Sequence, residues 1–197
     1  MSNLNRAVLD KIAARVRDSR RINYGTYSYF VWPYKGISPI DPEELRTLVL
    51  AMEQQLPPGS DLLFTFQSDG EILAIPLAWK LRRPLMVCRD TDYQMQDPLV
   101  ITQHTRYWTR NLYCEKLAPH SQVVLVEAII STGNTVIEAV RKIRSCKADV
   151  VGVVTVVSKV NYQGEQRIKQ ETGIDSTVLL RVAESPDNKS LTTEWLV

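Results

Sequence analysis

The sequence has few cysteines and histidines, and it therefore lacks the residues for a disulfide framework or a structural zinc site. Its 197 residues contain three cysteines, Cys88, Cys114 and Cys146, and no CxxC pair. A disulfide-framed miniprotein is therefore excluded, and we expect reduced thiols buried in the core of a cytoplasmic protein. The two histidines, His104 and His120, lie far from each other and from any cysteine at metal-ligand spacing, so we expect no structural zinc site.

An excess of one charge and long apolar runs are also missing. The 24 Lys and Arg residues nearly balance the 22 Asp and Glu residues, which leaves a net charge of +2. This is too little for a protein that coats a polyanion. No stretch approaches the roughly 20 apolar residues of a membrane span, and the charged N-terminus lacks the apolar core of a signal peptide. With 44% hydrophobic residues, the chain has a globular composition, not that of a disordered tail.

Strand and helix patterns alternate through most of the chain. Units of strand, helix and strand predict an α/β fold, namely a mostly parallel twisted sheet with helices on both faces. Asp41 followed by Pro42 is typical of a helix N-cap and first turn, and residues 190–197 indicate an added edge strand. The other expected strands are 62–66, 84–88, 123–126, 150–157 and 176–182, and the expected helices are 3–17, 42 to before Pro57, 72–81, 134–146 and 162–172.

The segment 123–136 carries the strongest chemical signal. Four apolar residues precede Glu127, and a Ser-Thr-Gly-Asn-Thr turn at 131–135 leads directly into a helix. The first N–H groups of a helix lack intrahelical partners and its dipole attracts anions, so this turn is a candidate phosphate site. Gly133 permits a tight turn and close approach of the backbone to the phosphate. Plain N-capping by the same residue types is the alternative.

This segment resembles the phosphoribosyl-diphosphate (PRPP) signature of type I phosphoribosyltransferases, in which four apolar residues and two acids precede a T-G-x-T-like loop. The layout over about residues 40–183 is most similar to the purine branch, the xanthine and adenine phosphoribosyltransferases. The resemblance implies transfer of the 5-phosphoribosyl group from PRPP to a purine or purine-like base, with release of pyrophosphate. It also implies Mg²⁺ held mainly by the substrate diphosphate, and a homodimer.

The resemblance also implies roles for individual residues. Glu127 would orient the ribose, Arg89 would help hold the leaving group, and Lys159 would contact the base. For Lys159, a strand-end lysine in water is the alternative. The implied 5′-phosphate loop is Ser131, Thr132, Gly133, Asn134 and Thr135, and the implied pyrophosphate loop is Gln67, Ser68, Asp69 and Gly70.

Three positions depart from the family pattern. Ala128 replaces the second acid, which would accept hydrogen bonds from the ribose and offset positive charge on it. Asp90 replaces a lysine beside the diphosphate, and Glu127 is one methylene longer than the usual aspartate. Losing one charged hydrogen bond costs roughly 1.5–3 kcal/mol. Three interpretations stay open: a PRPP enzyme with an altered pocket, an enzyme for a modified sugar phosphate or unusual base, and a PRPP- or nucleotide-binding regulatory protein without turnover.

Two aromatic segments have competing interpretations. Residues 24–34 form either a hood over a flat base or a dimer or core contact. Residues 90–113 correspond in the family to a mobile loop that closes over the diphosphate, and an exposed hairpin is the alternative. We expect one phosphoribosyltransferase-like domain over 1–197, with an N-terminal helix and hood at 1–40, a core at 41–183 and a C-terminal edge segment at 184–197. The side chains of interest in the second segment are Tyr93, Arg106, Tyr107, Trp108, Arg110 and Tyr113.

Overall fold

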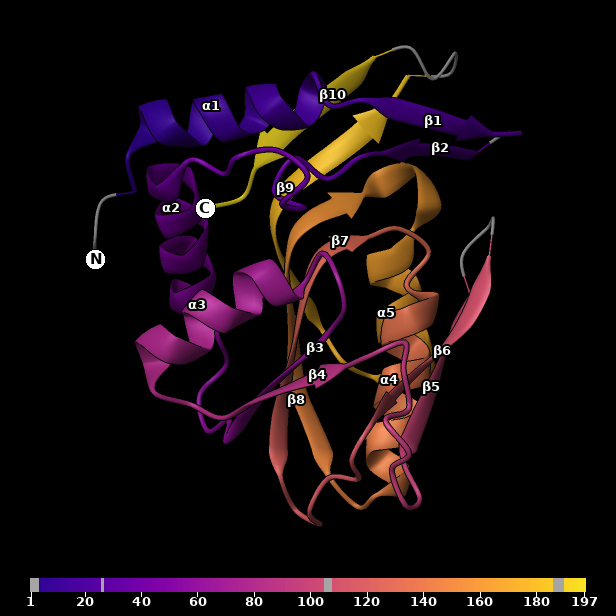
Figure 1. Cartoon of the computed structure of the whole chain (residues 1–197). Helices are drawn as coiled ribbons and strands as arrows, with labels where there is room; N and C mark the ends of the chain where they lie inside the picture. Colours follow the sequence, from indigo (N-terminus) through magenta and orange to yellow (C-terminus); the bar gives the residue numbers. More distant parts are fainter. Residues whose placement is uncertain (1–3, 26, 105–107, 186–189) are drawn as a thin grey trace.

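A six-stranded sheet with the strand order β10-β9-β8-β7-β3-β4 forms the centre of the molecule (Figure 1). The computed structural model describes residues 4–25, 27–104, 108–185 and 190–197. Every neighbouring pair in the sheet is parallel except β10, which runs antiparallel to β9 at the edge. The predicted α/β class is therefore confirmed, as is the C-terminal edge strand. The strands are β3 (Leu62–Phe66), β4 (Leu85–Cys88), β7 (Gln122–Ile130), β8 (Asp149–Lys159), β9 (Ser176–Glu184) and β10 (Leu191–Trp195).

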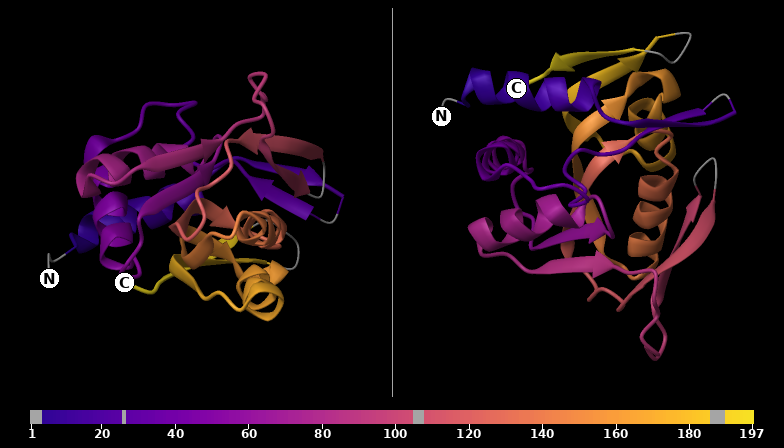
Figure 2. Two further views of the ribbon diagram at one scale, coloured as in Figure 1. Left: turned by 90° about the horizontal axis from the view of Figure 1, so that it is seen from below. Right: turned by 45° about the horizontal axis from the view of Figure 1, so that its top comes forward.

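Helices cover both faces of this sheet (Figures 1 and 2). One face carries α1 (Arg6–Arg17), α2 (Pro42–Gln54) and α3 (Glu71–Leu81), and the other carries α4 (Asn134–Ser145) and α5 (Gly164–Thr172). A short 3₁₀ turn, η1 (Val160–Tyr162), joins β8 to α5. Within the described residues, no helix combines the length and apolar character that crossing a membrane requires.

The alternation of side chains along β7 separates two hydrophobic clusters. Val124, Val126 and Ala128 face the cluster shared with α1, α2 and α3. Val123 and Leu125 face the cluster shared with α4 and α5. Because successive side chains of a strand point to opposite faces, β7 needs apolar residues at nearly every position, and this explains its unbroken apolar run.

The predicted cap of α2 is present. The Asp41 carboxylate accepts hydrogen bonds from the N–H groups of Glu43, at 2.8 Å, and Glu44, at 3.3 Å. Two of the donors that a helix start leaves without intrahelical partners are thereby satisfied.

The N-terminal aromatic segment forms a hairpin and then enters the core. Its strands are β1 (Arg21–Tyr24) and β2 (Tyr27–Phe30). Phe30, Trp32 and Tyr34 are almost completely buried in the cluster beneath α1 and α2, and the Tyr34 hydroxyl donates to Glu44 at 2.7 Å. This part of the segment is therefore core, as one of the alternatives held. The side chains of Tyr24 and Tyr27 lie outside what the structure describes.

The segment 90–113 contains a second hairpin, with strands β5 (Leu99–His104) and β6 (Thr109–Cys114). Ile101 and Leu112 are fully buried and belong to the cluster beneath α4, so the hairpin packs on the body of the protein. Arg106 and Tyr107 lie outside the described residues.

All three cysteines are free thiols, and two of them are in contact. Cys88 and Cys114 are buried, with their Sγ atoms 2.9 Å apart between β4 and β6, whereas Cys146 is half-buried. The expectation of core thiols is therefore met by Cys88 and Cys114.

Candidate functional site

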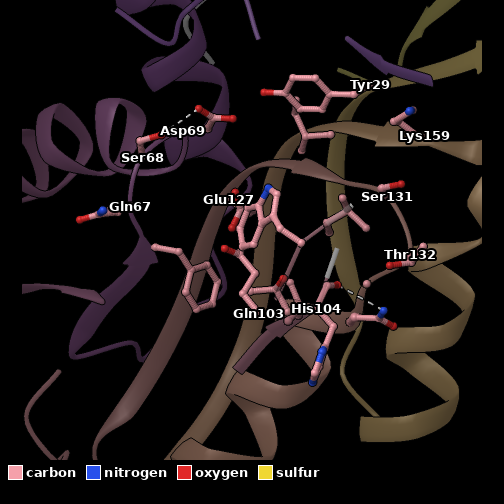
Figure 3. A pocket seen from close by; sticks show the side chains of 18 of the residues that line it. Tyr29, Gln67, Ser68, Asp69, Gln103, His104, Glu127, Ser131, Thr132 and Lys159 are labelled. Carbon is pink, nitrogen blue, oxygen red and sulfur yellow. Dashed lines mark hydrogen bonds between the residues drawn. The ribbon is translucent and has the colours of Figure 1, made fainter. Parts of the chain in front are cut away.

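A cavity of about 450 Å³ opens at the carboxyl ends of β3, β7 and β8 (Figure 3). This edge of a parallel sheet is where open α/β folds bind ligands. Figure 3 shows Ser68 and Asp69 on one side, Ser131 and Thr132 on the other, and Glu127 between them. The lining residues are Tyr29, Phe30, Lys35, Phe66, Gln67, Ser68, Asp69, Gln103, His104, Trp108, Arg110, Glu127, Ile129, Ile130, Ser131, Thr132, Gly133, Asn134, Thr135, Val136 and Lys159.

The hydroxylated turn at 131–135 lines this cavity and leads into α4. Gly133 precedes the helix with a φ of 78°, a left-handed conformation that glycine adopts at little cost, and it provides no side-chain cap. Among the described residues, none accepts a hydrogen bond from the N–H groups of 132–135. The buried Ser131 hydroxyl also lacks a partner there. The plain-capping alternative is therefore wrong, and the turn presents unused donors at a helix N-terminus, where anions bind.

Helix α5 supports the turn from behind. A Cβ added at Gly164 would lie only 2.1 Å from the Ser131 carbonyl oxygen. Arg167 Nη1 donates to the Thr132 carbonyl, at 2.7 Å, and to Asn134 Oδ1, at 2.8 Å. Sequence reasoning missed both Gly164 and Arg167, since neither belongs to a motif.

Glu127 lies at the centre of the cavity, and its environment disfavours its charge. Its Oε1 accepts a hydrogen bond from the Ala128 N–H at 3.1 Å. Burial raises the pKa of Glu127 to about 8, nearby Asp69 adds to the rise, and Lys35 opposes it. The raised pKa favours the protonated form of this carboxyl group near neutral pH, and a cation close to it would favour its ionised form.

The neighbouring position 128 faces away from the cavity. Ala128 is fully buried in the cluster with Val124 and Val126. Only Glu127 of this pair therefore lines the cavity, and the place of the expected second acid is occupied by apolar packing.

The loop after β3 forms the opposite wall. Gln67, Ser68 and Asp69 line the cavity, whereas Gly70 is buried beneath them. A Cβ at Gly70 would lie 2.3 Å from Thr65 Oγ1, so glycine allows the loop to lie this close to β3.

Two arginines near this wall are held by different partners. Arg89 pairs with Glu71 at 2.5 Å and is not among the lining residues. Arg110, on β6, lines the cavity and donates to the Gln67 carbonyl at 3.1 Å. Asp90 lies 3.5 Å from Arg110, so the acid at the expected lysine position faces an arginine.

Lys159 is the most buried of the cationic side chains that line the cavity. Its ammonium lies 2.7 Å from the Glu184 carboxylate, and both side chains are about 2% exposed. It also lies 4.5 Å from the ring centre of Tyr162 and 5.6 Å from that of Phe30. The alternative of a strand-end lysine in water is therefore wrong. Because an unpaired buried charge is strongly unfavourable, the pairing with Glu184 offsets the cost of burying Lys159 at the cavity wall.

The carboxylates at the cavity are few. Among the residues that the structure describes, no three His, Cys, Asp or Glu side chains lie close enough together to hold a metal ion. Asp69 and Glu127 offer hard oxygen donors to the cavity. This donor set fits a Mg²⁺ ion that keeps most of its ligands from a substrate and water.

The family was established by comparison with known proteins. The model of the phosphoribosyl transferase domain matches residues 43–181, most of the chain. The chain belongs to the phosphoribosyl transferase family. The resemblance inferred from residues 123–136 is thereby confirmed.

Phosphoribosyltransferases of the purine branch are among its relatives. The chain is 30% identical over 172 residues to a hypoxanthine/guanine phosphoribosyltransferase of Methanopyrus kandleri, covering 86% of this chain and 90% of that protein. It is 29% identical over 177 residues to the protein of the same name from Methanothermus fervidus, covering 89% and 93%. The adenine phosphoribosyltransferase of Thermoanaerobacter pseudethanolicus has the same fold, with a TM-score of 0.73 at 18% identity, covering 88% of this chain and 99% of that one.

The phosphoribosyltransferase pocket brings together most of the residues that the sequence assigned. Three of the assigned residues do not line it, namely Arg89, Ala128 and Gly70. Tyr29, from the segment predicted as a hood or core contact, and Trp108, from the segment predicted as a mobile loop or hairpin, both line it. Lining residues to which sequence reasoning gave no role are Lys35, Phe66, Gln103, His104, Ile129, Ile130 and Val136.

Proposed function

We propose that this phosphoribosyltransferase transfers the 5-phosphoribosyl group of PRPP to a purine or purine-like base. A nitrogen of the base bonds to C1 of the ribose, the bond from C1 to the diphosphate oxygen breaks, and pyrophosphate leaves while the base nitrogen loses its proton. The observation that carries this proposal is the turn at 131–135, whose unused donors open into the same cavity as Glu127. The names of the relatives support a purine acceptor.

The residues that line the cavity suggest a role for each wall. The turn at 131–135 would bind the 5′-phosphate, Glu127 would hold the ribose hydroxyls, and the loop 67–70 would hold the diphosphate. The base would then lie towards Lys159, between the aromatic rings of Tyr29 and Trp108. In this arrangement catalysis is mainly positioning and electrostatic stabilisation of positive charge on the ribose.

Mg²⁺, location and domain organisation complete the proposal. Bound Mg²⁺ would offset the charge of the departing diphosphate, and the diphosphate and water would supply most of its ligands. The protein would act in the cytoplasm as one domain, with residues 1–40 as helix and hood, 41–183 as core and 184–197 as edge segment.

A PRPP- or nucleotide-binding protein without turnover is the second candidate. Ala128 favours it, because only one carboxyl group of this pair is left to face the ribose, and burial raises the pKa of that group. A transferase for a modified sugar phosphate is favoured by the same feature.

An assay of pyrophosphate release distinguishes these functions. We expect the purified protein with Mg²⁺ and PRPP to release pyrophosphate when hypoxanthine, guanine, adenine or xanthine is added singly, and not without a base. Ribose 5-phosphate should inhibit competitively with PRPP, because both use the turn at 131–135. Saturable PRPP binding with no release for any base would favour the regulatory protein instead.

We further propose a homodimer formed through α3. This helix is apolar on nearly all sides, yet Ile75 is 52% exposed and Trp79 83% exposed. Exposed Ile37, 74% accessible, follows Gly36, whose position lies against Ile72 of α3. An apolar helix face of this kind is typical of a surface covered by a partner, and a second copy offers the same apolar face.

Trp79→Glu should weaken this dimer. A central tryptophan of an interface contributes about 2 kcal/mol or more, so the dimer dissociation constant in sedimentation velocity should rise at least about tenfold. Tyr93→Glu is the control, because it changes an exposed aromatic ring on the loop between β4 and β5. It should leave the dimer dissociation constant unchanged. A wild-type protein that sediments as a monomer, or equal effects of both variants, would contradict a dimer through α3.

A further inference from the structure

The diphosphate wall of the pocket carries a negative side chain. Asp69 lies on the loop 67–70, and its side chain is only 20% exposed. An uncompensated carboxylate here would repel a diphosphate, because like charges at close range in a partly buried site interact strongly. A cation beside Asp69 would offset this charge and would lie where it can meet the ligand.

The structure supplies that cation from a distant part of the chain. Lys35 follows the buried aromatic residues of the N-terminal hood and lines the cavity. Its ammonium donates to Asp69 Oδ1 and to Ser68 Oγ, the latter at 3.0 Å. Ser68 Oγ in turn lies 3.3 Å from Asp69 Oδ1 (Figure 3). Lys35 is thus held on the pyrophosphate loop itself.

The other cations at or near the cavity have different partners. Arg89 pairs with Glu71, and Lys159 pairs with the buried Glu184. Arg110 binds the Gln67 carbonyl and lies near Asp90. Of these four cations, Lys35 is the one whose ammonium is held by side chains of the loop 67–70, which a bound diphosphate would touch.

Building on the proposed function, we propose that Lys35 binds the diphosphate of PRPP and the released pyrophosphate. Asp69 and Ser68 are positioning residues that hold its ammonium at the wall while the pocket is empty. An ammonium has three donors on a flexible stem, so it can keep one contact with Asp69 and give others to phosphate oxygens. Asp69 also reduces the attraction of the empty wall for anions, so pyrophosphate is released more readily than from a wall with an unpaired lysine.

Direct binding of two ligands tests this role. Inorganic pyrophosphate with Mg²⁺ and, separately, ribose 5-phosphate are titrated calorimetrically into the full-length protein. Lys35→Met should weaken pyrophosphate binding at least about tenfold, the loss expected for one charged hydrogen bond. Ribose 5-phosphate binding should change less than about twofold, because the turn at 131–135 lies across the cavity. Lys35→Arg should restore part of the pyrophosphate affinity, since it keeps the charge.

The control is Lys116→Met, which removes a surface lysine paired with Asp97 outside the cavity. It should change neither affinity, and thermal unfolding should show that all variants are folded. Unchanged pyrophosphate binding by Lys35→Met, or an equal loss for both ligands, would overturn the role of Lys35 while leaving the proposed function intact. A wild-type protein that binds neither ligand would overturn the proposed function, and this inference with it.

Discussion

Replacing Glu127 by glutamine should lower kcat/KM for PRPP by roughly 100-fold. The carboxylate would accept hydrogen bonds from two ribose hydroxyls and stabilise positive charge as the bond at C1 breaks, whereas the amide has one acceptor and no charge. Charged hydrogen bonds contribute roughly 1.5–3 kcal/mol, and preorganised electrostatic groups contribute about 10²–10³ in rate. Glutamine keeps the size of the side chain, so the loss measures charge and not packing. Steady-state kinetics with saturating base gives the value.

The pH dependence tests the same residue in another way. In the free protein the pKa of Glu127 is about 8, so kcat/KM for PRPP should rise between pH 6 and 9 with a midpoint near 8, as the carboxylate forms. The Glu127→Gln profile should lack this rise. Identical profiles for the two proteins would remove Glu127 from the reaction.

The free energy of unfolding should also depend on the ionisation of Glu127. This pH dependence has the opposite sign to that of a carboxylate held in a salt bridge. Burial raises the pKa of Glu127 from its ordinary value of 4.5 to about 8, so between these values the folded protein keeps a proton that the unfolded chain releases. The contribution of Glu127 to stability therefore falls as pH rises from about 4.5 to about 8 and is constant above that range. Urea unfolding should find Glu127→Gln more stable relative to wild type at pH 8.5 than at pH 5. A constant difference would contradict the raised pKa.

Gly164→Ala should damage the phosphate turn although it lies outside the cavity lining. Its Cβ would lie 2.1 Å from the Ser131 carbonyl oxygen and 2.6 Å from Ile130 Cγ2, and a backbone oxygen cannot simply rotate away. Helix α5 must shift, and Arg167 then loses its hold on Thr132. We expect a loss of roughly 1–3 kcal/mol in the free energy of unfolding, and an affinity for ribose 5-phosphate at least about tenfold lower.

Gly173→Ala is the matched control at the other end of α5. Gly173 has a φ of +77° and no atom within 4 Å of an added Cβ, so alanine brings left-handed strain without a clash. It should cost roughly 1–2 kcal/mol in stability and leave ribose 5-phosphate binding unchanged. If Gly164→Ala were destabilised but bound ribose 5-phosphate normally, the support of the turn by α5 would not matter for binding.

The order of elements was predictable because their signals are local. The Asp41–Pro42 helix start depends on neighbouring residues, and so do the apolar runs of the central strands. The predicted end of β7 was wrong, because Glu127 interrupts the apolar run while the backbone continues to pair with β8 as far as Ile130. Likewise β8 continues to Lys159.

Residues of the site could be predicted only where they lie together in one short segment of the chain. The turn at 131–135 is a single motif, and its place at a helix start follows from the pattern. The pairs Lys35 with Asp69 and Lys159 with Glu184 join positions that are far apart in the chain, and no local pattern links them. The support of the turn by Gly164 likewise depends on how closely α5 packs, which a single sequence does not encode in a recognisable motif.

The contact between Cys88 and Cys114 makes the attachment of the second hairpin measurable without an added label. Both sulfurs are shielded from water where β4 meets β6, and the same hairpin brings Trp108 and Arg110 to the cavity. An alkylating reagent reaches either sulfur only when β6 separates from β4, whereas half-buried Cys146 is less shielded. The slow phase of thiol alkylation therefore reports how often the hairpin separates from β4 at this side of the pocket. A ligand that draws the hairpin inward will make this phase slower.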